Sequence, residues 1–497
     1  MNYTSTRDKS VVATASSAIA IGISPEGGLF VPQSFPTITM DFIKELIPMQ
    51  YTDRAKAVLS LYLTDFTDAE IAACADAAYG EQFDTDAIAP LHDLGDGRYM
   101  LELWHGPTCA FKDMALQILP HLMRVSVQKA APGEQTVILV ATSGDTGKAA
   151  LEGFKDAPDT RILVFYPQDG VSEMQRLQMI TQEGGNVGVC AIRGNFDDAQ
   201  TGVKSLFTNE AVKAHLAENG MRFSSANSIN WGRLLPQIVY YISAYCDLLR
   251  DGKVVAGDAI NIVVPTGNFG NILAAYYAKR MGLPVNKLIC ASNSNRVLTD
   301  FFESGVYDCN RPFYTTKSPS MDILVSSNLE RLLYHLADND AQAIAAMMSD
   351  LRENKKYTVP ATVKERASEL FAAGCASDDE AAATIRTTFE EKQYLCDTHT
   401  AVAVHVYDAY RAETGDTTPT VIASTANPYK FAPAIREALG DDAAGAPFEQ
   451  LSALEARTGA PIPSPLASLL DKAVRFTDVC DQDAASMQQM VYGLLHI

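Results

Sequence analysis

Short apolar runs alternate with amphipathic segments through the middle of the chain. Runs rich in Val and Ile at residues 137–141, 162–166 and 187–192 are each followed by a segment with helical spacing. The same order returns at residues 260–265 and 288–292. Such alternation is typical of parallel strands joined by crossover helices. The chain is therefore predicted to have an α/β fold.

The pattern divides the chain into three predicted regions. Residues 1–95 form a mixed N-terminal lead-in domain with helical spacing but no chemical motif. Residues 96–218 form one α/β unit. Residues 219–497 form a larger α/β unit with a helical insertion at about 328–391 and a C-terminal tail. A chain of 497 residues is long enough for two or three domains.

The composition narrows the function classes. There are 60 Asp and Glu against 40 Lys and Arg, which gives a net charge of −20. Nucleic-acid binding needs a concentrated basic surface, so no nucleic-acid partner is expected. The nine cysteines are scattered without a CxxC pair, which indicates reduced thiols in a cytoplasmic protein. The histidines form no HExxH motif, and no metal site is predicted.

No apolar run reaches the length that spans a bilayer, so no membrane association is expected. Residues 11–23 imitate a signal peptide, because they follow two basic residues and are largely apolar. However, Thr14, Ser16 and Ser17 interrupt the run, and a Pro-Glu-Gly-Gly turn follows it. We interpret this segment as folded structure.

A lysine stands at the start of a predicted helix in LELWHGPTCAFKDMALQ, residues 101–117. Apolar residues recur at helical spacing after Lys112, and Pro120 is expected to kink or shorten that helix. The positive end of a helix dipole disfavours a second positive charge. Lys112 therefore either extends to solvent and pairs with Asp113, or is buried with a lowered pKa and forms a Schiff base with a carbonyl cofactor. The segment alone leaves both interpretations open.

A glycine-containing turn lies between the predicted strand at 260–265 and the helix that follows it. The turn consists of Gly267, Asn268, Phe269, Gly270 and Asn271. Backbone N–H groups and the helix dipole converge on an anion at such a place, so the turn is a candidate phosphate cradle. Alternatively, the glycines serve only the geometry of a tight turn. The turn matches neither GxGxxG nor the Walker spacing.

Two further segments offer groups for a second anion. The turn with Thr142, Ser143 and Thr146 also joins a strand to a helix. Asp145 in this turn would repel an anion, so it faces a cofactor hydroxyl or caps the helix. Residue Asn227, with an arginine six residues later, could clamp a phosphate.

Arg233 is that arginine, and its planar fork suits a phosphate or carboxylate. The alternative is helix capping by the Asn and Ser residues plus a surface arginine. Ser424 and Thr425 end a predicted strand, where open α/β sheets present residues to a crevice. A hydroxyl there can meet an uncharged ring nitrogen, although core-edge hydroxyls are common.

Ordered motifs extend over nearly the whole chain. They are Ser5-Thr6-Arg7, SPEGGLFVP (24–32), LELWHGPTCAFKDMALQ (101–117), TSGDTG (142–147), SANSINWGR (225–233), VPTGNFGN (264–271), DTHTAVA (397–403) and STANPYKF (424–431). In this combination the chain resembles the threonine synthases of the longer microbial and fungal kind, within the fold type II family of pyridoxal-phosphate enzymes. It departs from that family at Asn427-Pro428-Tyr429, where His-Pro-Ala is frequent, and at Asn271, where Asp is frequent.

The resemblance implies a fold, a cofactor and site roles. The fold would have two parallel-sheet domains with flanking helices and an N-terminal mixed domain. Lys112 would bind pyridoxal 5′-phosphate covalently and shuttle protons. The turn from Gly267 to Asn271 would hold the cofactor phosphate, and Thr425 would meet the pyridine nitrogen. The substrate carboxylate and phosphate would be bound by Thr142, Ser143, Thr146, Asn227 and Arg233.

The implied activity is that of a lyase in threonine biosynthesis, which converts O-phospho-L-homoserine and water to L-threonine and phosphate. A serine/threonine dehydratase would keep Lys112 and the cradle but needs no second phosphate clamp. A catalytically silent binding module of the same fold is the other alternative. A dinucleotide oxidoreductase is remote, because the glycine fingerprint is missing. The oligomeric state, monomer or homodimer, is left open.

Overall fold

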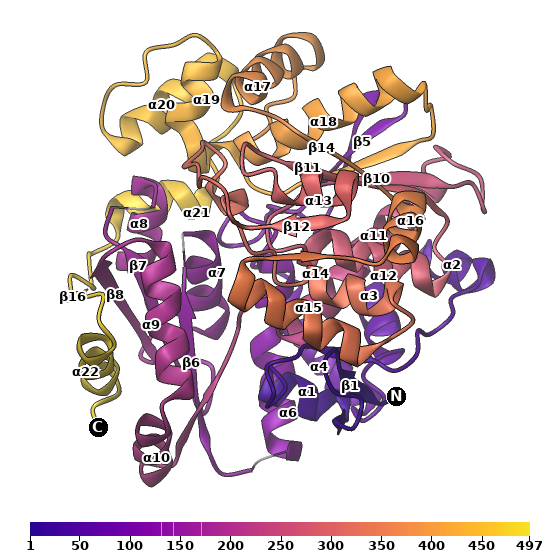
Figure 1. The fold of residues 1–497 in the computed structure, drawn as a ribbon. Helices are drawn as coiled ribbons and strands as arrows, with labels where there is room; N and C mark the ends of the chain where they lie inside the picture. The colour runs from indigo at the N-terminus through magenta and orange to yellow at the C-terminus, as the bar shows by residue number, and fades with distance from the viewer. Residues whose placement is uncertain (131, 143, 170) are drawn as a thin grey trace.

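Two mainly parallel sheets organise the molecule (Figure 1). The computed structural model describes residues 1–130, 132–142, 144–169 and 171–497. The larger sheet has six strands in the order β14 (Phe371–Cys375), β11 (Val285–Ser292), β10 (Ile260–Pro265), β15 (Thr420–Ser424), β5 (Arg98–Glu102) and β4 (Leu91–Gly95). Only β4, at its edge, runs antiparallel to its neighbour.

The second sheet has five strands, and every neighbouring pair is parallel. Their order is β16 (Val479–Asp481), β8 (Val187–Arg193), β7 (Thr160–Pro167), β6 (Gln135–Ala141) and β9 (Met221–Ser224). Residues 137–140 of β6 are completely buried. A parallel sheet is covered on both faces, which explains why its strands read as continuous apolar runs instead of alternating ones.

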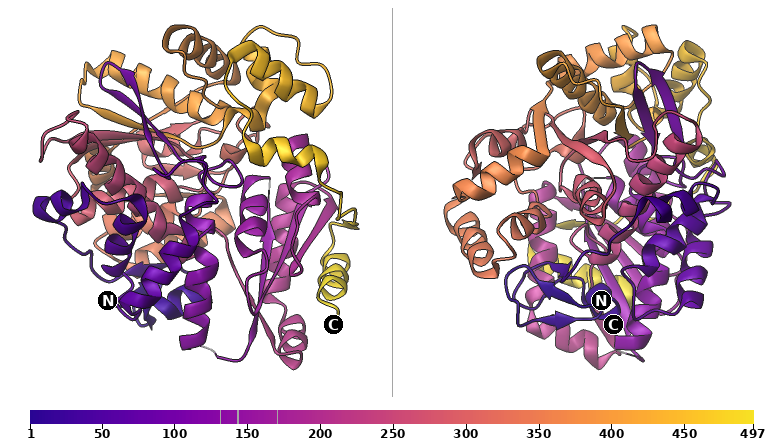
Figure 2. Two further views of the ribbon diagram at one scale, coloured as in Figure 1. Left: turned by 180° about the vertical axis from the view of Figure 1, so that it is seen from behind. Right: turned by 90° about the vertical axis from the view of Figure 1, so that its right-hand side faces the viewer.

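Helices pack against both sheets. Around the five-stranded sheet lie α7 (Asp145–Phe154), α8 (Glu173–Ile180), α9 (Phe196–Thr208), α10 (Glu210–Glu218) and α22 (Ala484–Leu495). Seen from behind in the left view of Figure 2, this sheet stands at one side of the molecule with α22 along its outer edge.

The six-stranded sheet separates two groups of helices in Figure 1. On one side lie α17 (Asp378–Lys392), α18 (Thr398–Thr414), α19 (Ala432–Ala438) and α20 (Pro447–Thr458). On the other side lie α11 (Trp231–Arg250), α12 (Gly270–Met281), α13 (Val297–Ser304), α14 (Leu329–Leu336), α15 (Ala341–Asn354) and α16 (Ala361–Leu370). Helix α11 is buried along almost its whole length and packs against α3 (Tyr51–Ser60), α5 (Asp113–Leu116) and α12.

The N-terminal region contains a small antiparallel sheet and four helices. Its elements are β1 (Tyr3–Ser5), β2 (Val12–Ala13), α1 (Ala15–Ile21), β3 (Phe30–Pro32), α2 (Met40–Leu46), α3 (Tyr51–Ser60) and α4 (Asp68–Ala78). The residues that imitate a signal peptide thus form β2 and α1. Helix α1 packs against α6 (Leu119–Ala130), and this contact connects the N-terminal region to the rest of the chain.

The helix predicted after Lys112 is two helices. These are α5 (Asp113–Leu116) and α6 (Leu119–Ala130), and Pro120 lies in the first turn of α6. Proline is tolerated in this first turn because the N–H that it lacks would have no partner within the helix. The remaining elements are β12 (Val306–Asp308), β13 (Lys356–Thr358), α21 (Ser464–Ala467) and the 3₁₀ turns η1 (Pro319–Met321), η2 (Pro428–Phe431) and η3 (Ser468–Asp471).

The predicted α/β fold with two parallel sheets and an N-terminal mixed region is confirmed. The domain boundaries at residues 95 and 218 stay predictions, and strand pairing crosses them. Strand β5 pairs with β15 in the large sheet, and β16 from the predicted tail pairs with β8 in the small one. Residues 371–375, predicted as part of the helical insertion, form the edge strand β14.

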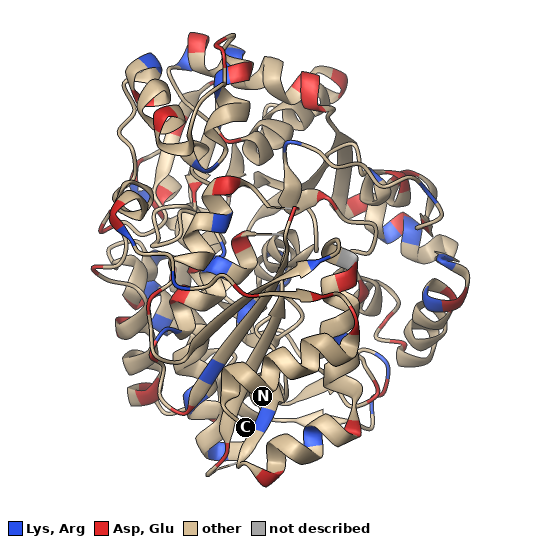
Figure 3. Ribbon diagram, turned by 90° about the vertical axis from the view of Figure 1, so that its left-hand side faces the viewer, with Lys and Arg blue, Asp and Glu red and all other residues tan. Residues whose placement is uncertain are grey.

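Acidic and basic residues are interspersed on the elements seen in Figure 3. Several of their ion pairs join distant parts of the chain, as Lys253 and Asp93 do with Nζ and Oδ2 2.8 Å apart. Such exposed pairs contribute little to stability. Among the described residues, no helix is long and apolar enough to cross a membrane.

Candidate active site

The loop that carries Lys112 is fastened to the end of β15. The N–H of Phe111 donates to the carbonyl of Thr425 (2.8 Å), and Ala110 forms a β-bridge with Ala426. Asp113 closes the loop from the other side, because its carboxylate accepts from the N–H (2.9 Å) and Oγ1 (2.6 Å) of Thr108. Lys112 is therefore held where the carboxyl ends of β5 and β15 meet, which is where open α/β sheets bind ligands.

The Lys112 side chain points inward, with only 8% of the residue exposed. Its Nζ lies 3.6 Å from Asp145 Oδ2, 3.4 Å from Ser320 Oγ and 4.9 Å from the centre of the Phe111 ring. Burial lowers the pKa of Lys112, and the nearby positive charges add to this effect, while Asp145 opposes it. The solvent-exposed interpretation with an Asp113 partner is wrong, because Asp113 is bonded to Thr108. A buried amine with a lowered pKa fits the alternative interpretation, a lysine that forms a Schiff base.

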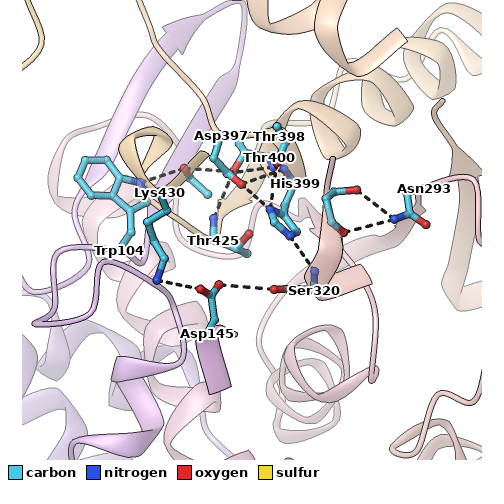
Figure 4. Close-up of polar contacts among 12 residues, drawn as sticks. Trp104, Asp145, Asn293, Ser320, Asp397, Thr398, His399, Thr400, Thr425 and Lys430 are labelled. Atoms are coloured by element: carbon cyan, nitrogen blue, oxygen red, sulfur yellow. Dashed lines mark hydrogen bonds and ion pairs between the residues drawn. The ribbon is translucent and has the colours of Figure 1, made fainter. Parts of the chain in front are cut away.

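Asp145, which lies beside Lys112, also pairs with a second buried lysine, Lys430. Figure 4 shows the pair of Asp145 and Lys430. Lys430 Nζ lies 2.8 Å from Asp145 Oδ1, and Gln175 Nε2 donates to the same oxygen at 2.9 Å. Burial alone would raise the pKa of Asp145, but the Lys430 and Lys112 ammonium groups outweigh it and hold that pKa well below its usual range. Asp145 is the first residue of α7 and not its cap, since Gly144 takes the cap position.

Sequence reasoning missed Lys430. Its side chain is completely buried, and its Nζ also donates to the carbonyl of Thr108 at 2.8 Å. The only signal was its position six residues after the end of β15, inside the STANPYKF motif. A lysine in that position is ordinarily a surface residue, so only the fold identifies it as part of the site.

The glycine-containing turn, which was predicted to cradle a phosphate, leads directly into the start of α12. Phe269 adopts a left-handed conformation (φ 64°) and precedes Gly270, the first helical residue. The free N–H groups of the first turn consequently face the carboxyl end of β10. A Cβ on Gly267 would lie 2.6 Å from the carbonyl oxygen of Ser320, so the glycine is required by space. Ser320 in turn contacts Lys112, which brings the cradle and the lysine together.

Asn271, the last residue of this turn, has a buried donor without a partner among the described residues. Its Oδ1 accepts from the hydroxyls of Tyr240 (2.9 Å) and Tyr241. Its Nδ2 is buried and makes no hydrogen bond among the described residues. A buried unpaired donor is costly in a folded protein. Together with the helix N-terminus, it indicates that the cradle is built for an anion.

Arg331 supports the cradle from behind. It is completely buried and donates to the carbonyls of Phe30 (3.0 Å) and Ile229 (2.6 Å) and to Oδ1 of Asn328 (2.5 Å). Asn328 donates through its N–H (3.1 Å) and Nδ2 (3.0 Å) to the carbonyl of Asn268. One guanidinium therefore joins the N-terminal sheet, the segment before α11 and the cradle.

Replacing Gly267 by alanine should weaken anion binding in the cradle. The new Cβ must push the turn away from Ser320 and Met321. The atoms that it meets there belong to the backbone and cannot rotate away. We expect the pyridoxal phosphate affinity, measured by fluorescence titration, to fall by roughly tenfold and the melting temperature to fall by a few degrees. Gly493→Ala is the matched control, since a Cβ there meets nothing within 4 Å. Unchanged affinity in Gly267→Ala would contradict the cradle.

Thr425 and His399 line the opposite side of the site (Figure 4). The Thr425 N–H donates to Thr400 Oγ1 at 3.2 Å, which fixes the end of β15. His399 Nε2 accepts from the N–H of Ser320 (3.1 Å), so Nδ1 carries the proton and donates to Asp397 Oδ2 (2.7 Å). His399 belongs to the DTHTAVA motif, but no role was predicted for it from the sequence. It positions Ser320 opposite Lys112.

Arg233 is buried with only 3% exposed, so the surface interpretation of this arginine is wrong. One Nη donates to the carbonyl of Ala226 at 2.9 Å, while Nε has no partner among the described residues. No carboxylate pairs with it within those residues, and burial lowers the pKa of Arg233 to about 10. Its charge acts on Lys112. A buried guanidinium without a counterion is suited to an incoming anion.

Three other predicted substrate groups lie shortly before α11 and around the start of α7. Asn227 is half-buried, and Asn230 caps α11 by accepting from the N–H of Gly232 at 2.8 Å. Thr142 Oγ1 accepts from the N–H groups of Gly144 (3.0 Å) and Gly147 (2.8 Å), so it stabilises its own turn.

Thr146 lies half-buried at the start of α7. Ser143 lies outside the described residues. Substrate binding by Thr142, Ser143, Thr146 and Asn227 stays a prediction.

Three family profiles match the chain: "Threonine synthase N terminus" at residues 2–79, "Pyridoxal-phosphate dependent enzyme" at 89–426 and "Threonine synthase, C-terminal" at 400–491. A threonine synthase from Pseudomonas aeruginosa is 38% identical over 439 residues, which cover 88% of this chain and 90% of that protein. The chain belongs to the threonine synthase family. Pyridoxal 5′-phosphate is the cofactor of this family of enzymes.

Other relatives of this threonine synthase family member are similar over most of the chain. The human protein named threonine synthase-like 1 is 42% identical over 434 residues, or 85% of this chain. The chain spans only 58% of that human protein's length. The structure of pyridoxal-phosphate-bound threonine synthase from Brucella melitensis superposes with a TM-score of 0.88 at 36% identity, covering 99% of both chains. Yeast threonine synthase has the same TM-score at 32% identity and covers 100% of this chain and 99% of its own.

Proposed function

We propose that the protein converts O-phospho-L-homoserine and water to L-threonine and phosphate. The observation that carries this proposal is Arg233, a buried guanidinium whose charge acts on Lys112 and which lacks a counterion among the described residues. The cradle at Gly267–Asn271 accounts for one phosphate, that of the cofactor. Arg233 supports a second anion site, which a phosphorylated substrate needs and a dehydratase does not.

The residues of the site fit pyridoxal phosphate. Lys112 supplies a buried amine with a lowered pKa, and the cradle supplies a helix N-terminus with the unpaired Nδ2 of Asn271. We assign the pyridine nitrogen to the Thr425 hydroxyl. A hydroxyl partner, unlike a carboxylate, leaves the ring nitrogen uncharged.

When bound, pyridoxal phosphate supplies an aldehyde for amino groups and a conjugated ring that takes up electron density from the substrate Cα. Lys112 Nζ, whose pKa is lowered by burial, is placed to take the proton from Cα and then a proton from Cβ. Arg233 binds the γ-phosphate and orients it for departure. The buried side chains of Lys430 and Asp145 exclude bulk water beside Lys112.

A phosphate-release assay with amino-acid analysis of the product tests the proposal. The purified protein, loaded with pyridoxal phosphate, should release phosphate from O-phospho-L-homoserine and form L-threonine in equal amount. A 2-oxo acid formed from L-serine or L-threonine as the main activity would assign a dehydratase instead. A coloured protein that retains the cofactor but turns over neither substrate would assign the silent binding module.

The proposal also includes the cellular compartment in which the protein acts. All nine cysteines are free thiols in the structure, and most are buried. We infer a reducing compartment, the cytoplasm, for the enzyme.

A further inference from the structure

We propose that Asp145 is a positioning residue that holds the protonated amine of Lys112 between proton transfers, and that Lys430 limits how firmly it does so. This inference rests on the proposed function and deepens it. A base that takes a proton from one carbon and then from another must be stable in both charge states. It needs a nearby negative charge, but not one that locks the ammonium form.

The two oxygens of Asp145 have different partners (Figure 4). Oδ1 faces Lys430 Nζ at 2.8 Å and Gln175 Nε2 at 2.9 Å. Oδ2 faces Lys112 Nζ at 3.6 Å and Ser320 Oγ at 3.5 Å. The shorter ion pair is thus made with Lys430, and the longer one with Lys112. One carboxylate is shared between two ammonium groups, and the reacting amine receives the weaker contact.

The charged groups that act on Lys112 come from three elements. Asp145 belongs to α7, Lys430 to η2 and Arg233 to α11. Asp145 is the single negative group among these three. Without Asp145 the amine would face two cations and could hardly keep a proton. Without Lys430 the carboxylate would be free to pair fully with Lys112 and would retain the ammonium form.

Lys430 is fixed so that it cannot take over the role of Lys112. Its side chain is completely buried, and its Nζ is bound to the carbonyl of Thr108 as well as to Asp145. Thr108 lies in the loop that carries Lys112 and also binds Asp113. The distance between the two lysines is therefore set by one short, hydrogen-bonded loop. Asp145 comes from the five-stranded unit, so its contact also joins the two sheets.

The expected signature is a pair of opposite shifts in the pKa of Lys112. Asp145→Asn removes the only negative neighbour of the three, so the apparent pKa of Lys112 should fall by about 1–3 units. Lys430→Met removes a positive neighbour and frees Asp145, so that pKa should rise. In the Asp145→Asn background, Lys430→Met should produce a smaller rise, because the freed carboxylate is gone.

Two measurements report these shifts. In the full-length chain without cofactor, competitive acetylation across a pH series, read by peptide mass spectrometry, gives the apparent pKa of Lys112. In the loaded enzyme, the acidic limb of the kcat/KM profile for phosphate release should move in the same direction. Lys44→Met is the control, because Lys44 lies exposed on α2 with only Asp41 as its partner.

The outcomes separate this inference from the proposed function. An unchanged Lys112 pKa in Asp145→Asn overturns the inference, even if the wild-type protein releases phosphate. Opposite shifts in a protein that releases no phosphate support the assignment of Asp145 and overturn only the activity. If Lys430→Met does not fold, the isosteric Asp145→Asn variant still decides. A merely structural role for Asp145 would change the melting temperature without moving the pKa.

Discussion

Lys112→Ala should abolish both phosphate release and covalent capture of pyridoxal phosphate. The buried amine is the group that fits a Schiff base, and the same atom is placed to move the substrate protons. General-base catalysis alone contributes about 10²–10⁴-fold, so we expect turnover to fall by at least about 10³-fold. Borohydride reduction followed by mass spectrometry should find the cofactor on Lys112 in the wild type and not in the variant.

The matched control for this loss is Lys44→Ala on exposed α2. It should retain full turnover and the same borohydride label at Lys112. A Lys112→Ala variant that keeps activity within tenfold of the wild type would contradict the catalytic role of this amine. Residual non-covalent cofactor binding would not contradict it, because the cradle is independent of Lys112.

Arg233→Met should have the second largest effect, and it should fall on the substrate. Loss of one partner from a buried charge-assisted hydrogen bond costs about 2–5 kcal/mol. We therefore expect kcat/KM for O-phospho-L-homoserine to fall by about 10²–10³-fold, with unchanged cofactor affinity. Steady-state kinetics and fluorescence titration of the cofactor measure these two quantities separately.

The same variant should not destabilise the protein. Arg233 has an unpaired Nε and no carboxylate partner in the described part of the chain, so burying it costs free energy of folding. The melting temperature of Arg233→Met should equal or exceed that of the wild type. Arg250→Met, at the exposed end of the same helix, is the kinetic control. Normal kinetics in Arg233→Met would remove the second anion site from the proposal.

The local signals in the sequence were sufficient for the central strands of both sheets and for the turn that precedes α12. Runs such as residues 137–140 and 260–265 are buried on both faces and mostly apolar, as is typical of strands in a parallel sheet. The order of the predicted elements along the chain was enough to place the glycine turn at Gly267 between a strand and a helix. Lys112 was identified by its unusual place at a helix start. Its burial was not, because the side chain direction depends on the whole fold.

What the sequence could not reveal depends on contacts between distant segments. Lys430 and His399 become part of the site only because η2 and α18 pack beside the Lys112 loop. Strand β14 was missed since its sequence, FAAGC, is short and made of small residues that carry little β preference. The burial of Arg233 was also hidden, because helical spacing marks a single apolar face, whereas α11 is buried on almost all sides.

The anchoring of the Lys112 loop on β15 sets an order of events during synthesis. The ribosome makes residues 103–112 long before Thr425 and Ala426, on which this loop is pinned. Contacts so far apart in sequence form slowly and late. Newly made protein therefore cannot complete the surroundings of Lys112 until the ribosome has synthesised residues 425–426.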